Sequence, residues 1–354
     1  MQKYKTFIFH RPNNRINNGI RKSFLKNCKV SDNLRQTGTL PHIIRLFFVF
    51  SGLAWNFKKR ITVTFNMKND YSRPRGEIES LIYLLDDPDP DVQQGVRKRF
   101  RELGESAVPM LDQYRTQSVR DSEIDAIGEI IYSITSESIF DEYADVVERG
   151  IDNRMDLENA LLVLCRFGNP TLRTQEYRLK LDELSRGISS KISYTPSMSE
   201  KMQLLLQYIF RELRFRGDSA NYHHPDNAYL DRVIDRRKGL PIMLSVVVMS
   251  LAHRIGLPFY GVNMPIHFML MYETPSHPLL IDPFDGGAVV TYNQCYYFLK
   301  KNGVDPRPEH LAKASELDVL VRCIRNLMNS YARQKDEKRI QDLRRLLQIT
   351  EMNG

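Results

Sequence analysis

The most apolar stretch of the chain runs from Ile242 to Ile255 and reads IMLSVVVMSLAHRI. Apolar side chains fall on nearly every side of a helix drawn through it, and such a helix is typical of a buried position. Gly256 and Pro258 follow directly, a combination typical of a helix end. We therefore expect a buried central helix around which the neighbouring elements are arranged.

Shorter apolar segments follow this helix. Their patterns predict three strands, at residues 259–263, 267–272 and 279–281. The Pro/Ser/His segment 275–278 predicts a hairpin connection, and Asp285-Gly286-Gly287 predicts a tight turn. On the other side of the central helix, residues 229–238 form a charged amphipathic pattern that ends at Gly239.

The N-terminal part of the pattern is helical. From residue 76 to about 167, apolar residues recur at three- and four-residue spacing, and Asp-Pro breaks separate them, as in LLDDPDPDVQQGVR. Helix pairs joined in this way predict a HEAT-like array over residues 67–168. A plain helical bundle packed on the next domain explains the same pattern. Two longer helices are expected next, at residues 171–186, with Gly187 as the stop, and at residues 197–215.

The C-terminal part returns to helices after Tyr292. The segment VLVRCIRNLMNSYARQKDEKRIQDLRRLLQIT predicts two consecutive helices that resemble one tetratricopeptide-type pair. A single pair cannot form a solenoid. We expect residues 304–354 to pack as a cap on the core.

The positive charge is confined to the N-terminal segment. Residues 1–66 hold 13 Lys and Arg against one acid, Asp32, whereas residues 67–354 hold 38 basic and 42 acidic side chains. We expect residues 1–66 to be either disordered or upstream of the native start, since Met67 opens a more ordinary sequence. A basic arm for membrane or nucleic acid is the alternative. We expect no nucleic-acid binding from the folded body.

Composition favours a cytoplasmic protein. The 354 residues are enough for two or three domains. The four cysteines, Cys28, Cys165, Cys295 and Cys323, show neither CxxC spacing nor a disulfide framework. The apolar run at residues 43–57 contains Arg45 and is too short for a confident membrane span, so no membrane association is expected.

Several phrases together resemble the SirB-type transglutaminase-like family. They are FRGDSANYHHPDNAYLDRVIDRRKGLPI, HRIGLPFYGVNMPIHFMLMY and IDPFDGG, with a tetratricopeptide-like ending in VRCIRNLMNSYARQKD. The resemblance covers residues 170–350. It implies a papain-like α+β core over residues 169–303, with helices before and after it, in a family found mainly in bacteria.

The resemblance also implies a catalytic arrangement. In transglutaminase-type sites a cysteine at the start of the buried helix attacks an amide, a strand histidine accepts the proton, and a carboxylate orients the histidine. Carried over, His267 is the base and Asp282 its partner, 15 residues apart on neighbouring strands. If their side chains lie more than about 4 Å apart, this pairing is wrong.

The position of the nucleophile holds no reactive side chain. It falls at Ile242 or Met243, and Ser245 lies about 200° further round a helix from Met243. Cys295 lies beyond the third strand, in a different element. We therefore expect a non-catalytic binding or regulatory protein. A hydrolase or acyltransferase that uses His267 and Asp282 without a thiol is the alternative.

The resemblance and the charge pattern also predict a ligand surface. We expect it to bind a peptide or a small acidic ligand, because arginine suits carboxylates. Its members are Asn227, Arg236, Arg237 and Asp285, together with His267 and Asp282. A protein or peptide partner would use this cleft or the helical flanks. No cofactor is expected, and His223 and His224 lack the third ligand that a metal site requires.

Overall fold

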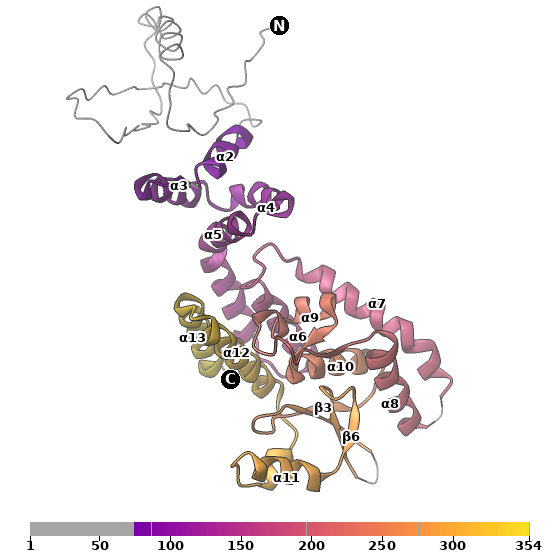
Figure 1. Cartoon of the computed structure of the whole chain (residues 1–354). Coiled ribbons are helices and arrows are strands. Elements are labelled where there is room, and N and C mark those ends of the chain that lie inside the picture. Colours follow the sequence, from indigo (N-terminus) through magenta and orange to yellow (C-terminus); the bar gives the residue numbers. More distant parts are fainter. Residues whose placement is uncertain (1–73, 86, 196, 275–276, 354) are drawn as a thin grey trace, which may run out of the picture. The chain divides into compact units, whose positions relative to one another are not determined.

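The computed structural model describes residues 74–353, apart from residues 86, 196, 275 and 276 (Figure 1). The chain divides into two units, Met1–Arg73 and Pro74–Gly354, and the fold below is that of the second. The predictions for residues 1–66 lie outside the described residues. The described fold is α+β, with many helices and two small sheets.

The first helices pack around an apolar cluster of their own. They are α2 (Pro74–Tyr83), α3 (Pro90–Leu103), the 3-10 turn η2 (Gly104–Ala107), α4 (Val108–Gln117) and α5 (Asp121–Glu148). The Asp-Pro break acts as expected: Asp89 caps α3 by accepting the Asp91 N–H, and Pro90 occupies the first helical position. The buried apolar residues of this cluster lie between Ile78 and Ile131. A larger apolar cluster begins at Tyr132, so α5 contributes to both.

Three further helical segments lead to the centre of the fold. They are α6 (Arg154–Cys165), α7 (Thr174–Ser193) and α8 (Met198–Gln207), which continues as the π-helical turn η3 (Tyr208–Glu212). The predicted stop at Gly187 is wrong, because α7 continues through it. A Cβ atom at Gly187 would lie 2.2 Å from the hydroxyl oxygen of Tyr208, so glycine there permits close packing against η3.

The central helix is α10 (Pro241–Arg254), and its bounds agree closely with the prediction. Every residue from Pro241 to Ala252 is buried. A two-stranded parallel pair, β1 (Arg216–Gly217) and β2 (Lys238–Gly239), leads into it, with the turn η4 (Pro225–Asn227) and helix α9 (Leu230–Arg236) between the strands. Gly256, with φ +71°, follows α10 as expected of a helix end.

A four-stranded antiparallel sheet follows α10, in the order β3-β4-β5-β6. The strands are β3 (Phe259–Val262), β4 (Met269–Tyr272), β5 (Leu279–Asp282) and β6 (Ala288–Val290), of which the last was not predicted. Alternate residues serve different clusters: Leu270 and Ile281 belong to the cluster of α10, and Met271 and Leu280 to that of α11 (Tyr292–Lys301). Figure 1 shows the strands between these two helices.

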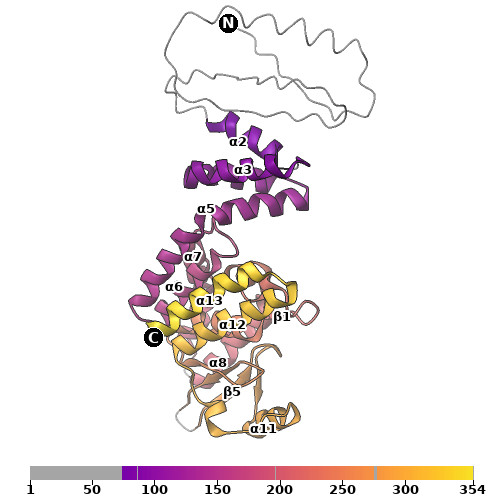
Figure 2. The same cartoon turned by 90° about the vertical axis from the view of Figure 1, so that its left-hand side faces the viewer.

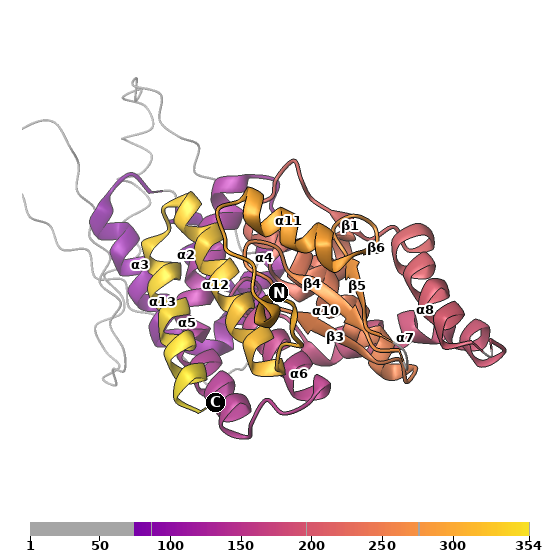
Figure 3. The ribbon, with the colours of Figure 1, turned by 90° about the horizontal axis from the view of Figure 1, so that it is seen from below.

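The C-terminal helices α12 (Glu316–Gln334) and α13 (Glu337–Met352) pack against each other and against α5 and α6 (Figures 2 and 3). The short turn η5 (Pro308–Leu311) precedes them. Tyr132 of α5 donates to Asp342 at 2.5 Å, and the hydroxyls of Tyr143 and Thr350 lie 2.8 Å apart. These bonds join segments more than 200 residues apart. No helix in the described part of the chain is long and apolar enough to cross a membrane.

Candidate functional site

His267 and Asp282 form a hydrogen-bonded pair at the ends of two neighbouring strands. His267 lies two residues before β4, and Asp282 ends β5. The Nε2 atom of His267 lies 2.9 Å from Oδ1 of Asp282, well inside the 4 Å limit set above. Their side chains are 19% and 20% exposed, so the pair is accessible from solvent.

Asp282 is held in its charged form. Its Oδ1 also accepts the backbone N–H groups of Phe284 and Asp285, at 2.8 and 3.3 Å. Burial alone would raise the pKa of Asp282, but the hydrogen bond and charge of His267, with these two N–H donors, lower it below its ordinary value. A charged Asp282 favours a histidine whose Nε2 carries a proton. The Nδ1 atom of His267 has no hydrogen-bond partner among the described residues, so it can accept a proton or a ligand donor.

The segment before His267 is strained. Ile266 has φ +71°, a left-handed conformation that is a genuine outlier for a β-branched side chain, and it is 49% exposed. Phe268, on the other side, is 2% exposed and anchors the strand in the core. The imidazole packs edge-on against Phe284 and Phe298, with ring centroids 6.3 and 5.9 Å away. Strain of this kind is frequent at ligand sites.

Phe284 connects the pair to the start of α10. A Cβ atom at Gly217 would lie 2.4 Å from the Phe284 ring, so the ring packs directly on the backbone of β1. Gly217 is paired with Gly239, which lies two residues before α10. The fold therefore brings the His267–Asp282 pair to the same region as the N-terminal end of the central helix.

That end of α10 presents no nucleophile. Ile242 and Met243 are 1% and 0% exposed and belong to the core cluster of the central helix. Ser245 is also fully buried, and its hydroxyl donates to the carbonyl of Pro241 at 2.9 Å. Along the first turn of α10, hydroxyl and thiol groups are thus either absent or turned inward.

Sequence reasoning missed the proximity of Cys295. It lies on α11, one turn before Phe298, whose ring contacts His267. Burial and then the negative charge of Asp282 raise the pKa of the Cys295 thiol. A raised pKa keeps the thiol protonated, which is the opposite of an activated cysteine. The proximity results from the packing of α11 across the sheet, which the spacing of residues along the chain does not reveal.

Three of the predicted ligand residues have defined surroundings. Asn227 is 0% exposed, and its side-chain amide donates to the carbonyl of Asn221 at 2.7 Å. Arg236 donates to the side-chain oxygen of Asn227 at 3.1 Å and to Asp218 at 3.2 Å. These contacts hold the loop before α9 in place. Asp285 is exposed beside Asp282.

Arg237 stands apart from this network. It ends α9 with φ +59°, and its guanidinium lies 4.5 Å above the Phe215 ring. Burial lowers its pKa. Its Nη1 atom is buried without a hydrogen-bond partner among the described residues.

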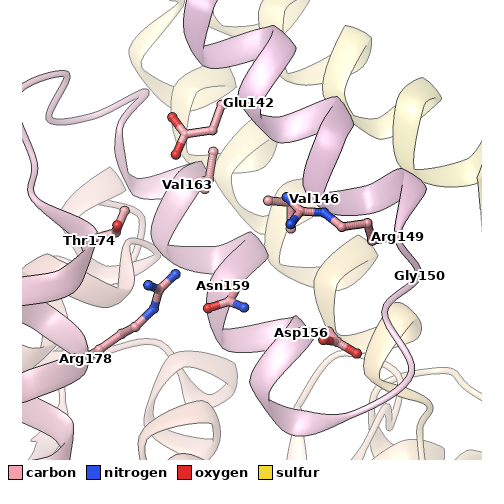
Figure 4. Close-up of a pocket in the computed structure, with 9 residues that line it drawn as sticks. All are labelled: Glu142, Val146, Arg149, Gly150, Asp156, Asn159, Val163, Thr174 and Arg178. Atoms are coloured by element: carbon pink, nitrogen blue, oxygen red, sulfur yellow. The ribbon is translucent and has the colours of Figure 1, made fainter.

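A pocket of about 330 Å³ lies elsewhere, along α6 between α5 and α7 (Figure 4). Figure 4 shows Arg149 and Arg178 on either side of Asn159. Glu142 at its edge forms an ion pair with Arg166. None of the residues predicted for the ligand surface lines this pocket. The His267–Asp282 pair therefore lies outside this pocket. It is the candidate site because of the chemistry of its side chains and their partial exposure.

Comparison with known proteins shows that part of the chain is similar to transglutaminase-like proteins. Residues 175–325, from α7 into α12, match the model of the transglutaminase-like superfamily. A UPF0162 protein of Xylella fastidiosa is 29% identical over 187 residues, which cover 51% of this chain and 66% of that protein. A UPF0162 protein of Pseudomonas aeruginosa is 34% identical over 175 residues, covering 46% of this chain and 63% of that protein.

A human protein is also similar to part of the chain. The F-box only protein 21 of Homo sapiens is 26% identical over 156 residues, covering 42% of this chain and 24% of that protein. The chain thus spans about two thirds or less of the length of these relatives. No solved structure matches the chain significantly.

Proposed function

We propose that this protein is a transglutaminase-like binding or regulatory protein that does not use thiol catalysis. Its ligand, a protein or peptide segment, binds at the surface around His267 and Asp282. The observation that carries the proposal is the first turn of α10, where Met243 is 0% exposed and Ser245 donates its hydroxyl inward. Attack on an amide needs an exposed, activated nucleophile at this position.

The state of the Cys295 thiol supports the same function. Cys295 is 4% exposed, and its raised pKa disfavours the thiolate that nucleophilic chemistry requires. The pair itself is suited to binding, because Asp282 is charged and Nδ1 of His267 is free for a ligand donor. A degenerate site of this kind offers directed polar contacts without a covalent step.

The alternative is a hydrolase or acyltransferase that uses His267 and Asp282 with a non-thiol nucleophile, such as water. A free Nδ1 and a charged orienting carboxylate favour it, since this is the arrangement of a general base. Screening a fluorogenic peptide–amide library separates the two functions. Turnover that is lost in His267→Ala supports the alternative, and absence of turnover in the wild type supports binding.

The binding function is tested with partners captured from the native host. Wild-type protein and a His267→Ala/Asp282→Asn variant are used as baits, and the captured proteins are quantified. We expect at least one partner to be lost from the variant while the variant melts near the wild-type temperature. An identical set of partners from both baits would contradict the role of this surface.

Finer features belong to the same proposal. We propose a SirB-type member of the family, a HEAT-like arrangement of the helices up to residue 168, and a tetratricopeptide-like pair in residues 304–354. The helices before and after the core provide additional surface to which a partner protein binds. We also propose a cytoplasmic location, in keeping with cysteines that form no disulfide framework.

A further inference from the structure

The two-stranded ladder before α10 places like charges side by side. Arg216 of β1 and Lys238 of β2 are partners in the parallel register. Like charges directly opposite each other in a sheet are destabilising. In the described part of the chain, no carboxylate forms an ion pair with either residue.

Two further arginines flank this pair, and both have an unfavourable backbone. Arg214 has φ +61° and Arg237 has φ +59°, although only glycine adopts the left-handed region without cost. The chain segments are adjacent, because the Arg216 N–H donates to the Arg237 carbonyl at 3.0 Å. We call Arg214, Arg216, Arg237 and Lys238 the basic ladder.

The acids near the basic ladder are already engaged. Asp218 pairs with Arg236, Asp235 with Lys180, and Glu212 with Lys191. Arg237 keeps a buried Nη1 without a partner among the described residues. The basic ladder thus combines a repulsive pair and two residues in the left-handed region, and local costs of this kind gather at functional sites.

The basic ladder adjoins the candidate site. Gly217 directly follows Arg216 and packs against the Phe284 ring, which in turn contacts His267. Side chains alternate along a strand, so the Arg216 side chain lies on the face of β1 opposite the one that Phe284 covers. The basic ladder and the His267–Asp282 pair are therefore neighbouring but separate surfaces.

We infer that the basic ladder docks an acidic peptide segment of a partner protein, whose carboxylates neutralise the Arg216–Lys238 pair. Arginine binds carboxylates through paired, charge-assisted hydrogen bonds. The inference goes beyond the binding function proposed above, because it adds a second surface for a partner. The chain's own residues 1–66 do not fit as the occupant, since they carry 13 basic side chains and one acid.

Nucleic acid fits the basic ladder less well than an acidic peptide. Single-stranded nucleic acid is held by basic grooves with exposed aromatic platforms, whereas the aromatic ring at the basic ladder, Phe215, is 1% exposed beneath Arg237. Residues 67–354 also carry more acidic than basic side chains, which opposes a long polyanion.

The experiment measures fluorescence anisotropy of labelled probes on the full chain at low salt. The probes are a hexaglutamate peptide, a hexaglutamine peptide and a uridine hexanucleotide. Arg214→Gly removes a charge and relieves the left-handed backbone. Lys335→Gly is its matched control, because Lys335 is exposed, also has φ +60°, and lies at the end of α12, which contributes no residue to the basic ladder.

We expect the hexaglutamate peptide to bind the wild type and the hexaglutamine peptide not to bind. Arg214→Gly and Arg216→Gln should each weaken hexaglutamate binding about two- to fivefold, as exposed ion pairs do. Both should melt at or above the wild-type temperature, because each removes an unfavourable feature. Lys335→Gly should leave affinity unchanged.

Equal losses in Arg214→Gly and Lys335→Gly would overturn the inference, as would tighter binding of the hexanucleotide than of hexaglutamate. Binding of hexaglutamine equal to that of hexaglutamate would also overturn it. A His267→Ala/Asp282→Asn variant separates the two proposals. If it binds hexaglutamate normally while the basic-ladder variants do not, the inference stands and the basic ladder acts without the pair. If it loses as much affinity as the basic-ladder variants, the inference of a separate surface is overturned.

Discussion

Two polar side chains, Arg254 and His267, differ in the number of their hydrogen-bond partners and in their exposure. Arg254, at the end of α10, donates to both oxygens of Glu158 at 2.7 and 2.9 Å and to Asp182 at 2.6 Å. Its side chain is 11% exposed, and that of Glu158 is 0% exposed. His267 makes one hydrogen bond, is 19% exposed and keeps Nδ1 free.

The difference distinguishes a polar side chain that is fully bonded within the fold from one that remains available to a ligand. Arg254 joins α10 to α6 and α7, and its guanidinium is saturated by carboxylates and the Ser250 carbonyl. His267 joins only two adjacent strand ends, and a strained Ile266 precedes it. We conclude that Arg254 is fully bonded within the fold, whereas the His267–Asp282 pair leaves Nδ1 accessible, as the proposed binding function requires.

The largest expected effect comes from Arg254→Ala. It leaves Glu158 buried without its partner, and breaking a buried ion pair in this way costs about 3–5 kcal/mol. Urea denaturation of the variant measures the loss. Arg325→Ala is the control, because Arg325 and Glu351 form a pair that is 57% and 48% exposed, and such exposed pairs contribute about 0–1 kcal/mol. Similar losses of stability in both variants would contradict a special structural role for Arg254.

A smaller effect is expected from Asp282→Asn, and it depends on pH. The folded pKa of Asp282 is lowered, so its contribution to stability is present above its unfolded pKa of about 3.9 and disappears as pH falls through the folded value. The stability difference between wild type and variant should therefore shrink as pH falls below about pH 4. Urea titrations from pH 5 to pH 3 measure it, and a difference that grows over this range would contradict the lowered pKa.

The smallest expected effect comes from Ile266→Gly. Removing a left-handed β-branched residue gains about 1–2 kcal/mol, and the added freedom of the unfolded chain offsets about 0.4–1 kcal/mol of that gain. We expect a slight rise in melting temperature together with weaker binding at His267, because the segment is loosened. A clear loss of stability would show that Ile266 is not strained.

The sequence predicted the elements whose pattern is local. The bounds of α10 and its Gly256 end follow from an apolar run and a glycine. The pairing of His267 with Asp282 was implied by the family resemblance, and their 15-residue separation agreed with two adjacent strands. The strand β6 was not predicted, because its three residues form an edge with weak alternation. The π-helical turn after α8 and the passage of α7 through Gly187 depend on tertiary packing, which overrides local helix signals.

The surroundings of the site residues could not be read from spacing. Asn227 is fully buried and its side chain bonds to the Asn221 carbonyl and to Arg236, and Cys295 comes near Asp282 because α11 packs on the sheet. Both follow from long-range packing. The absence of a nucleophile at the start of α10 was visible in the sequence, and the burial of Met243 adds that the position faces the core.

The reactivity of a cysteine placed at residue 243 tests the central claim most directly. In Met243→Cys, the alkylation rate by iodoacetamide is compared with those of Cys165 and Cys323, which are 1% and 0% exposed, after circular dichroism confirms folding. We predict a rate as slow as theirs and unchanged by His267→Ala, because residue 243 faces the core. A fast rate that falls in His267→Ala would show a nucleophile position served by His267, and would contradict the non-catalytic account.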